Sequence, residues 1–202
     1  MNPLLQDIVA LLAITNPLGA IPAFLAITKR VDSRERWGAA IRAALAVATI
    51  LAVAALAGTP ILKAFGISMP AFRVAGGLVI LLMGLEMMRG TPTRVQHDEE
   101  LKASAADQVL VPLAMPLIAG PGAITTVITL SARAAGWREV AMLLGAVLVI
   151  ATITLLTLSS AAWLGRKIGE RGQRILLRFM GLILAAVGAQ VLLSGLHSFT
   201  PG

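Results

Sequence analysis

Six apolar segments divide this 202-residue chain, and they constrain its fold more than any other feature. They cover residues 4–28, 39–57, 71–88, 109–130, 140–164 and 175–196. A helix needs roughly 20 apolar residues to cross a hydrocarbon core of about 30 Å, whereas a membrane strand needs only about 10 alternating ones. The sequence therefore predicts an all-α integral membrane protein with six transmembrane helices. The expected connections are polar and basic at 29–37, 89–108 and 165–174, and short at 58–70 and 131–139.

The composition agrees with a bilayer location. The mean hydropathy is +0.87, 57% of the residues are hydrophobic and only 13% are charged, values that are atypical of a soluble domain. The absence of cysteine excludes disulfides, thiolate metal sites and thiol nucleophiles. The net charge of +7 does not indicate nucleic-acid binding, because the basic residues lie between apolar segments, where the positive-inside rule accounts for them.

Lysine and arginine fall unequally on the two sides of this six-helix layout. One side, which begins with Lys29 and Arg30, carries 13 of them; the other carries 4, at Lys63, Arg73, Arg133 and Arg138. The richer side is expected to face the cytoplasm. This predicts a multi-pass membrane protein with both termini outside.

The chain also resembles itself at a fixed spacing of 104 residues. The matched pairs are Gly77 with Gly181, Gly84 with Gly188, Glu86 with Gln190, and Asn16-Pro17 with Gly120-Pro121 (181 − 77 and 121 − 17 both give 104). We therefore predict one transmembrane domain made of two three-helix repeats, residues 1–95 and 109–202, joined by a cytoplasmic linker over 96–108. Because three spans is an odd number, the second repeat is inverted relative to the first, which is a recurring transporter design.

Helix breakers lie near the middle of the first and fourth apolar segments, at residues 15–22 and 112–122. Proline removes an amide donor, glycine permits bent backbone, and freed backbone groups in hydrocarbon need protein or a cavity to satisfy them. We therefore predict that helices 1 and 4 are broken at the midplane. The predicted substrate-binding residues there are Asn16, Pro17, Gly19, Gly120, Pro121, Gly122, Thr125 and Thr126.

These residues also have simpler interpretations. Proline and glycine are common in membrane helices, small residues let helices pack closely, and the Asn16 amide could merely brace a kink. The hydroxyls of Thr125 and Thr126 could either bind a solute or ease the second break. Because the breaks match at equivalent depth, we favour a binding site at the paired breaks, whereas the two interpretations of the threonine hydroxyls are held equal.

Four further polar residues are candidates for coupling or gating: Glu86, Gln190, Arg73 and Arg178. Glu86 lies in the last turn of the third helix, where reaching the interface competes with proton coupling. For the two arginines, snorkelling to lipid headgroups is the default interpretation and a gate is the alternative. The acidic run that follows His97 is expected to be a solvated loop and not a metal site. No cofactor is predicted, apart from a coupling Na+ or H+.

At these residues the sequence resembles the MarC family of bacterial inner-membrane proteins, a branch of the lysine-exporter-like transporter superfamily. The resemblance rests on residues 16–24, 112–116 and 119–124, and it extends over the whole length and six-span layout. It implies location in the bacterial inner membrane and uptake or export of small neutral amino acids such as glycine and alanine. It also implies that an ion gradient drives this transport and that broken helices 1 and 4 line the path.

Other classes of function fit less well. A membrane-embedded enzyme would need a nucleophile and base, or metal ligands, at bilayer depth, but the two histidines, His97 and His197, lie in a loop and near the C-terminus. A passive channel and a non-transporting accessory protein stay open as alternatives.

The expected partners are the lipid bilayer and a small neutral solute. The glycine pairs predict close helix contacts within or between protomers, so a homo-oligomer stays open as well.

Overall fold

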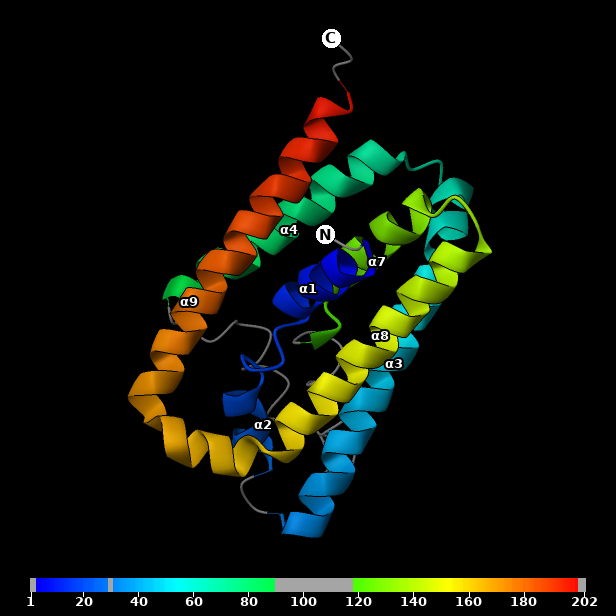
Figure 1. The fold of residues 1–202 in the computed structure, drawn as a ribbon. Helices are drawn as coiled ribbons and strands as arrows, with labels where there is room; N and C mark the ends of the chain where they lie inside the picture. Colours follow the sequence, from blue (N-terminus) through cyan, green and yellow to red (C-terminus); the bar gives the residue numbers. More distant parts are fainter. Residues whose placement is uncertain (1–2, 29–30, 90–117, 200–202) are drawn as a thin grey trace.

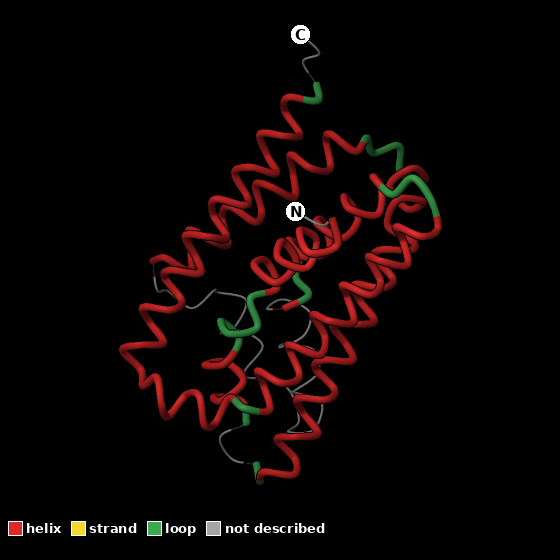
Figure 2. Tube along the Cα trace, in the orientation of Figure 1, coloured by secondary structure: helices red, strands yellow, loops and turns green. Residues whose placement is uncertain are grey.

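The computed structural model describes residues 3–28, 31–89 and 118–199, most of which are helical. The helices are α1 (Pro3–Thr15), α2 (Ile21–Ile27), α3 (Ser33–Ala64), α4 (Met69–Arg89), α7 (Pro121–Arg133), α8 (Trp137–Ser159) and α9 (Ala161–His197). These described ranges contain no strand (Figure 2). Four helical segments are long and apolar enough to cross a membrane: α3, α4, α8 and residues 171–197 of α9. The all-helical prediction is confirmed, and these four segments correspond to the second, third, fifth and sixth apolar windows.

The long helices form two pairs, α3 with α8 and α4 with α9, and the short helices α1 and α7 lie between the pairs (Figure 1). α1 packs against α8 and α7, while α7 also packs against α3 and α4. Each short helix has 13 residues, so each is about 20 Å long at 1.5 Å per residue. Neither crosses a bilayer core of about 30 Å by itself.

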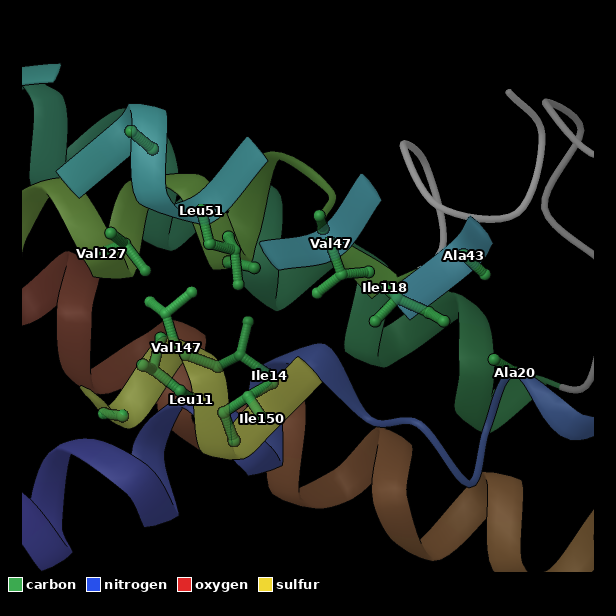
Figure 3. Close-up of a cluster of buried hydrophobic side chains, with 14 of the residues drawn as sticks. Leu11, Ile14, Ala20, Ala43, Val47, Leu51, Ile118, Val127, Val147 and Ile150 are labelled. Atoms are coloured by element: carbon green, nitrogen blue, oxygen red, sulfur yellow. The ribbon is translucent and has the colours of Figure 1, made fainter. Parts of the chain in front are cut away.

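The buried core surrounds these two short helices. It combines Leu11 and Ile14 of α1 with side chains of α3, α7 and α8, among them Leu51, Val127 and Ile150 (Figure 3). All five are at most 6% exposed. Since lipid tails are as apolar as leucine, close packing rather than escape from water holds such helices together. The packing therefore fixes α1 and α7 against each other.

The closest helix contact is the glycine seam, which we define as Gly77 and Gly84 of α4 with Gly181 and Gly188 of α9. A methyl group added at Gly77 would lie 2.7 Å from the Cα of Leu192 and 2.9 Å from the Gly188 carbonyl oxygen. At Gly84 it would lie 2.7 Å from the Gly181 carbonyl oxygen. The predicted close contact of these glycines therefore forms within one chain, with α4 and α9 antiparallel.

The structure corrects two predicted connections. Residues 165–174, expected to be a polar loop, belong to α9, which bends at Gly169, where φ is 64°. The side-chain amide of Gln173 donates to the Gly165 carbonyl across this bend, at 3.1 Å. Residues 58–64, also expected to be a connection, continue α3 up to a turn at Gly66, where φ is 67°. The predicted linker 96–108, with His97, and the start of the fourth apolar window lie outside the described residues.

Candidate functional site

The first apolar window is interrupted at Asn16, as predicted. Its N–H donates the last bond of α1, to the Leu12 carbonyl at 3.0 Å, and its φ of 39° then turns the chain out of the helix. Asparagine adopts this left-handed conformation more easily than most residues because its short polar side chain can bond locally. Pro17 follows and has no N–H with which to continue the helix. The dipeptide Asn16-Pro17 therefore ends α1.

A tight turn, residues 16–20, connects α1 to α2. The N–H of Gly19 donates to two oxygens of Asn16, the backbone carbonyl at 3.0 Å and the side-chain Oδ1 at 3.2 Å. A methyl group at Gly19 would lie 2.9 Å from Cγ of Asn16, so a glycine is needed there. Asn16 is 7% exposed, and its neighbour Pro17 is buried as well. The turn thus begins inside the protein at Asn16 and Pro17, whereas Leu18 is 37% exposed.

The second interruption precedes α7. Gly120 is extended, with ψ of −179°, and Pro121 occupies the first turn of the new helix, a position that proline favours. No side chain caps this helix start, and Gly120 is buried together with Ile118 and Ala119. The start of α7 therefore presents backbone N–H groups and the positive end of a helix dipole beside the buried residues 118–120, while Pro121 itself is exposed.

The two interruptions lie close together. A methyl group at Gly122 would lie 3.3 Å from Cγ2 of Ile14, two residues before Asn16, and 2.8 Å from Cγ1 of Ile80 in α4. Figure 3 shows Ile14 and Ile118, one beside each interruption, in the same buried cluster. The negative C-terminal end of α1 and the positive N-terminal end of α7 are thus brought together in the core.

The two predicted threonines have different surroundings. The hydroxyl of Thr126 donates to the Gly122 carbonyl at 2.9 Å, so it stabilises the first turn of α7. The side chain of Thr125 is 4% exposed and lies against Gly76 of α4, closely enough that any side chain at position 76 would meet it. Of the two, Thr125 is the better candidate to contact a solute.

The four candidates for coupling or gating are not brought together. Glu86 is half-buried near the end of α4, whereas Gln190 and Arg178 are exposed on α9. Arg73 is half-buried near the start of α4, and its Nε atom is buried without a hydrogen-bond partner in the described part of the chain. Of the four, Arg73 is the one with a buried hydrogen-bond donor that lacks a partner in the described residues.

Two features beside the interruptions were not predicted from the sequence. A small cleft lies between α2 and α9, with Leu18 and Pro22 on one wall and Gly165 and Gln173 on the other. In α7, the hydroxyl of Thr129 is buried without a partner in the described residues. The spacing of Thr125, Thr129 and Arg133 on one helical face is the sequence signal that would have drawn attention to it.

Comparison with known proteins identifies the family. A sequence model described as MarC family integral membrane protein matches residues 1–200. The UPF0056 membrane protein MJ1677 of Methanocaldococcus jannaschii is 40% identical over 93% of this chain and 93% of its own length. The UPF0056 membrane proteins YvbG of Bacillus subtilis and YhcE of Escherichia coli are 34% and 33% identical, each over 96% of this chain and over 93% and 92% of their lengths. No solved structure matches. The chain belongs to the MarC family of integral membrane proteins.

Proposed function

We propose that this protein transports small neutral amino acids such as glycine and alanine by ion-coupled alternating access. The observation that carries the proposal is the meeting of the two interruptions in the buried core. The end of α1 offers carbonyl groups to an ammonium, and the uncapped start of α7 offers N–H groups to a carboxylate. A zwitterion of the size of glycine or alanine complements both ends at once.

The glycine seam supports an inverted-repeat architecture for this transporter. A methyl group at Gly77 would meet Gly188 and Leu192, and one at Gly181 would meet Gly84 and Met88. Subtracting 104 from the first set of contacts gives the second (188 − 104 is 84, and 192 − 104 is 88). Contacts that reciprocate at the repeat spacing are what a two-fold axis between α4 and α9 would produce, and such axes relate the halves of many transporters.

The orientation that we propose places the basic end of the molecule in the cytoplasm. We define the basic end as the one where α3 begins and α9 bends, with Arg34, Arg36, Lys167 and Arg171. At the opposite end α3 ends, α4 begins and α7 ends. In this orientation both termini are outside.

Cysteine labelling tests the orientation directly, because the natural chain has no cysteine. We expect a membrane-impermeant maleimide to label a Ser198→Cys variant in intact cells, since Ser198 is exposed beyond the end of α9. A matched Ser33→Cys variant, exposed at the start of α3, should react only after permeabilisation. The opposite pattern would reverse the proposed orientation.

Uptake of radiolabelled glycine and alanine into proteoliposomes, under imposed sodium or proton gradients, tests the transport activity. We expect saturable uptake that accelerates when unlabelled solute is present on the far side. Gly122→Leu should abolish it, because even a methyl group at this position would lie 2.8 Å from Ile80. Gly145→Ala, on a part of α8 with open space around it, is the matched folding control. Uptake without acceleration would favour a channel, and no uptake by folded protein would refute the amino-acid assignment.

A further inference from the structure

One face of α7 carries a line of polar residues from the interruption toward the end opposite the basic end. Thr125, Thr129 and Arg133 are spaced four residues apart, so they lie above one another on the same side of the helix. Thr125 contacts Gly76 of α4, which shows that this side of α7 faces α4. The line therefore runs along the α4–α7 contact.

The register of this contact brings Arg73 of α4 to the level of Thr129 of α7. Gly122 of α7 lies beside Ile80 of α4, and Thr125 of α7 lies beside Gly76 of α4. A step of one turn forward along α7 therefore corresponds to a step of one turn back along α4. Continuing the same antiparallel register by one further turn brings Arg73, whose Cβ lies beside Gly195 of α9, to the level of Thr129. Arg133 then lies one turn beyond, near the start of α4.

Both Arg73 and Thr129 have unused hydrogen-bonding capacity. The Nε of Arg73 and the hydroxyl of Thr129 are buried, and neither has a partner in the described part of the chain. Thr129 is only 8% exposed. Five other threonines satisfy their hydroxyls on the carbonyl four residues back: Thr15, Thr28, Thr126, Thr152 and Thr154. Thr59 of α3 is a second threonine whose buried hydroxyl has no partner in the described residues. Buried polar groups are normally satisfied, so two unpartnered groups at the same level of the α4–α7 contact, which do not bond each other, point to a ligand.

The local charges indicate that this ligand is an anion. Arg133 lies near enough to Arg73 and to Asp7 of α1 to act electrostatically on both. Two guanidinium groups and one carboxylate leave one positive charge uncompensated among the three. Guanidinium groups bind carboxylates with charge-assisted, often bidentate hydrogen bonds. An incoming carboxylate would satisfy both the donors and the charge.

We propose that Arg73, Thr129 and Arg133 form an entry site that binds the carboxylate of the solute before it reaches the interruptions. The inference rests on the proposed transport function, because it assigns the entry step of the same solute. From this site the face of α7 leads through Thr125 to the uncapped N–H groups at the start of the helix.

Binding is tested by thermal unfolding of the purified full chain in detergent. Sodium propionate should raise the midpoint saturably, by about 5 °C when it is well above its Kd. Propionamide, and sodium chloride at the same ionic strength, should not. An equal effect of chloride or propionamide would overturn the carboxylate assignment. So would stabilisation by an anionic phospholipid with none by propionate, since a lipid phosphate would then be the ligand.

Variants locate the site. Arg73→Gln should remove the response to propionate, whereas Arg89→Gln, an exposed arginine at the other end of α4, should keep it. Thr129→Val is nearly isosteric and removes an unsatisfied hydroxyl. In the absence of propionate, the unfolding midpoint of Thr129→Val should be unchanged or higher than that of the natural protein. Its affinity for propionate should be about tenfold weaker. If Thr129→Val binds propionate as tightly as the natural protein, the entry site is wrong, whether or not Arg73→Gln folds.

Transport separates this inference from the proposed function. For alanine uptake we expect Arg73→Gln to raise KM about 10- to 100-fold with kcat less affected, since charge-assisted hydrogen bonds are lost at the entry step. Unchanged KM in Arg73→Gln and Thr129→Val, with active natural protein, would refute the entry site and leave the function standing. Propionate binding that requires Arg73 in a protein that moves no amino acid would support the site and refute the function.

Discussion

Gly84→Ala is expected to destabilise the protein by about 1–3 kcal/mol, the usual cost of overpacking a tight contact. The added methyl group would lie 2.7 Å from the Gly181 carbonyl oxygen and 2.8 Å from the Cα of Ala185. Both are backbone atoms, so no side chain can turn aside, and the whole of α4 would have to move away from α9. Because helix association in a bilayer depends on close packing, this movement weakens the contact along the entire seam.

The matched variant Gly188→Ala should cost a similar amount. Its methyl group would lie 2.7 Å from the Cα of Leu81 and 2.9 Å from the Gly77 carbonyl oxygen, which is the counterpart of the Gly84 contact at the repeat spacing (84 + 104 is 188). Gly145→Ala, with open space around it, is the control and should be neutral or stabilising by up to about 1 kcal/mol. Denaturant titration in micelles measures all three. A large difference between Gly84→Ala and Gly188→Ala would contradict the proposed two-fold relation of α4 and α9.

The sequence predicted the interruptions because their cause is local. Asn16-Pro17 combines a residue that tolerates positive φ with one that cannot donate the next helical bond, and Gly120-Pro121 combines a flexible residue with a favoured first helical residue. The glycine seam was also accessible from the sequence, since the repeat spacing and the absence of side chains both point to close contact. Predicting these features requires only the identity of neighbouring residues or a comparison of the chain with itself.

Other features depended on information that hydropathy does not carry. Residues 165–174 were expected to be a connection because they are rich in charge, yet they belong to α9. One of the charged side chains there, Lys167, has a partner on its own helix, because its ammonium lies 4.8 Å from the centre of the Trp163 ring. The unsatisfied hydroxyl of Thr129 could not be recognised either. Whether a threonine bonds its own helix is decided by side-chain rotamers and by the register of the facing helix.

Asn16→Ala is expected to lower kcat/KM for alanine uptake about 100-fold. Alanine at φ of 39° costs roughly 1–2 kcal/mol, and the loss of a buried amide costs a further 1–3 kcal/mol. Together these correspond to a change of about two orders of magnitude. Proteoliposome uptake at several solute concentrations measures it, with the unfolding midpoint as the check on folding. Uptake within a few-fold of the natural protein would mean that the first interruption is not part of the solute site.

Asn16→Gly distinguishes whether the Asn16 side-chain amide binds the solute or only braces the turn. Glycine adopts positive φ without penalty, and the backbone carbonyl of residue 16 still accepts from Gly19, so the interruption should persist. The Oδ1 atom of Asn16 bonds Gly19, whereas Nδ2 makes no hydrogen bond within the described residues and is able to donate to a carboxylate. We therefore expect Asn16→Gly to fold normally and still transport poorly. If it transports like the natural protein, the amide only braces the turn, and backbone groups alone bind the solute there.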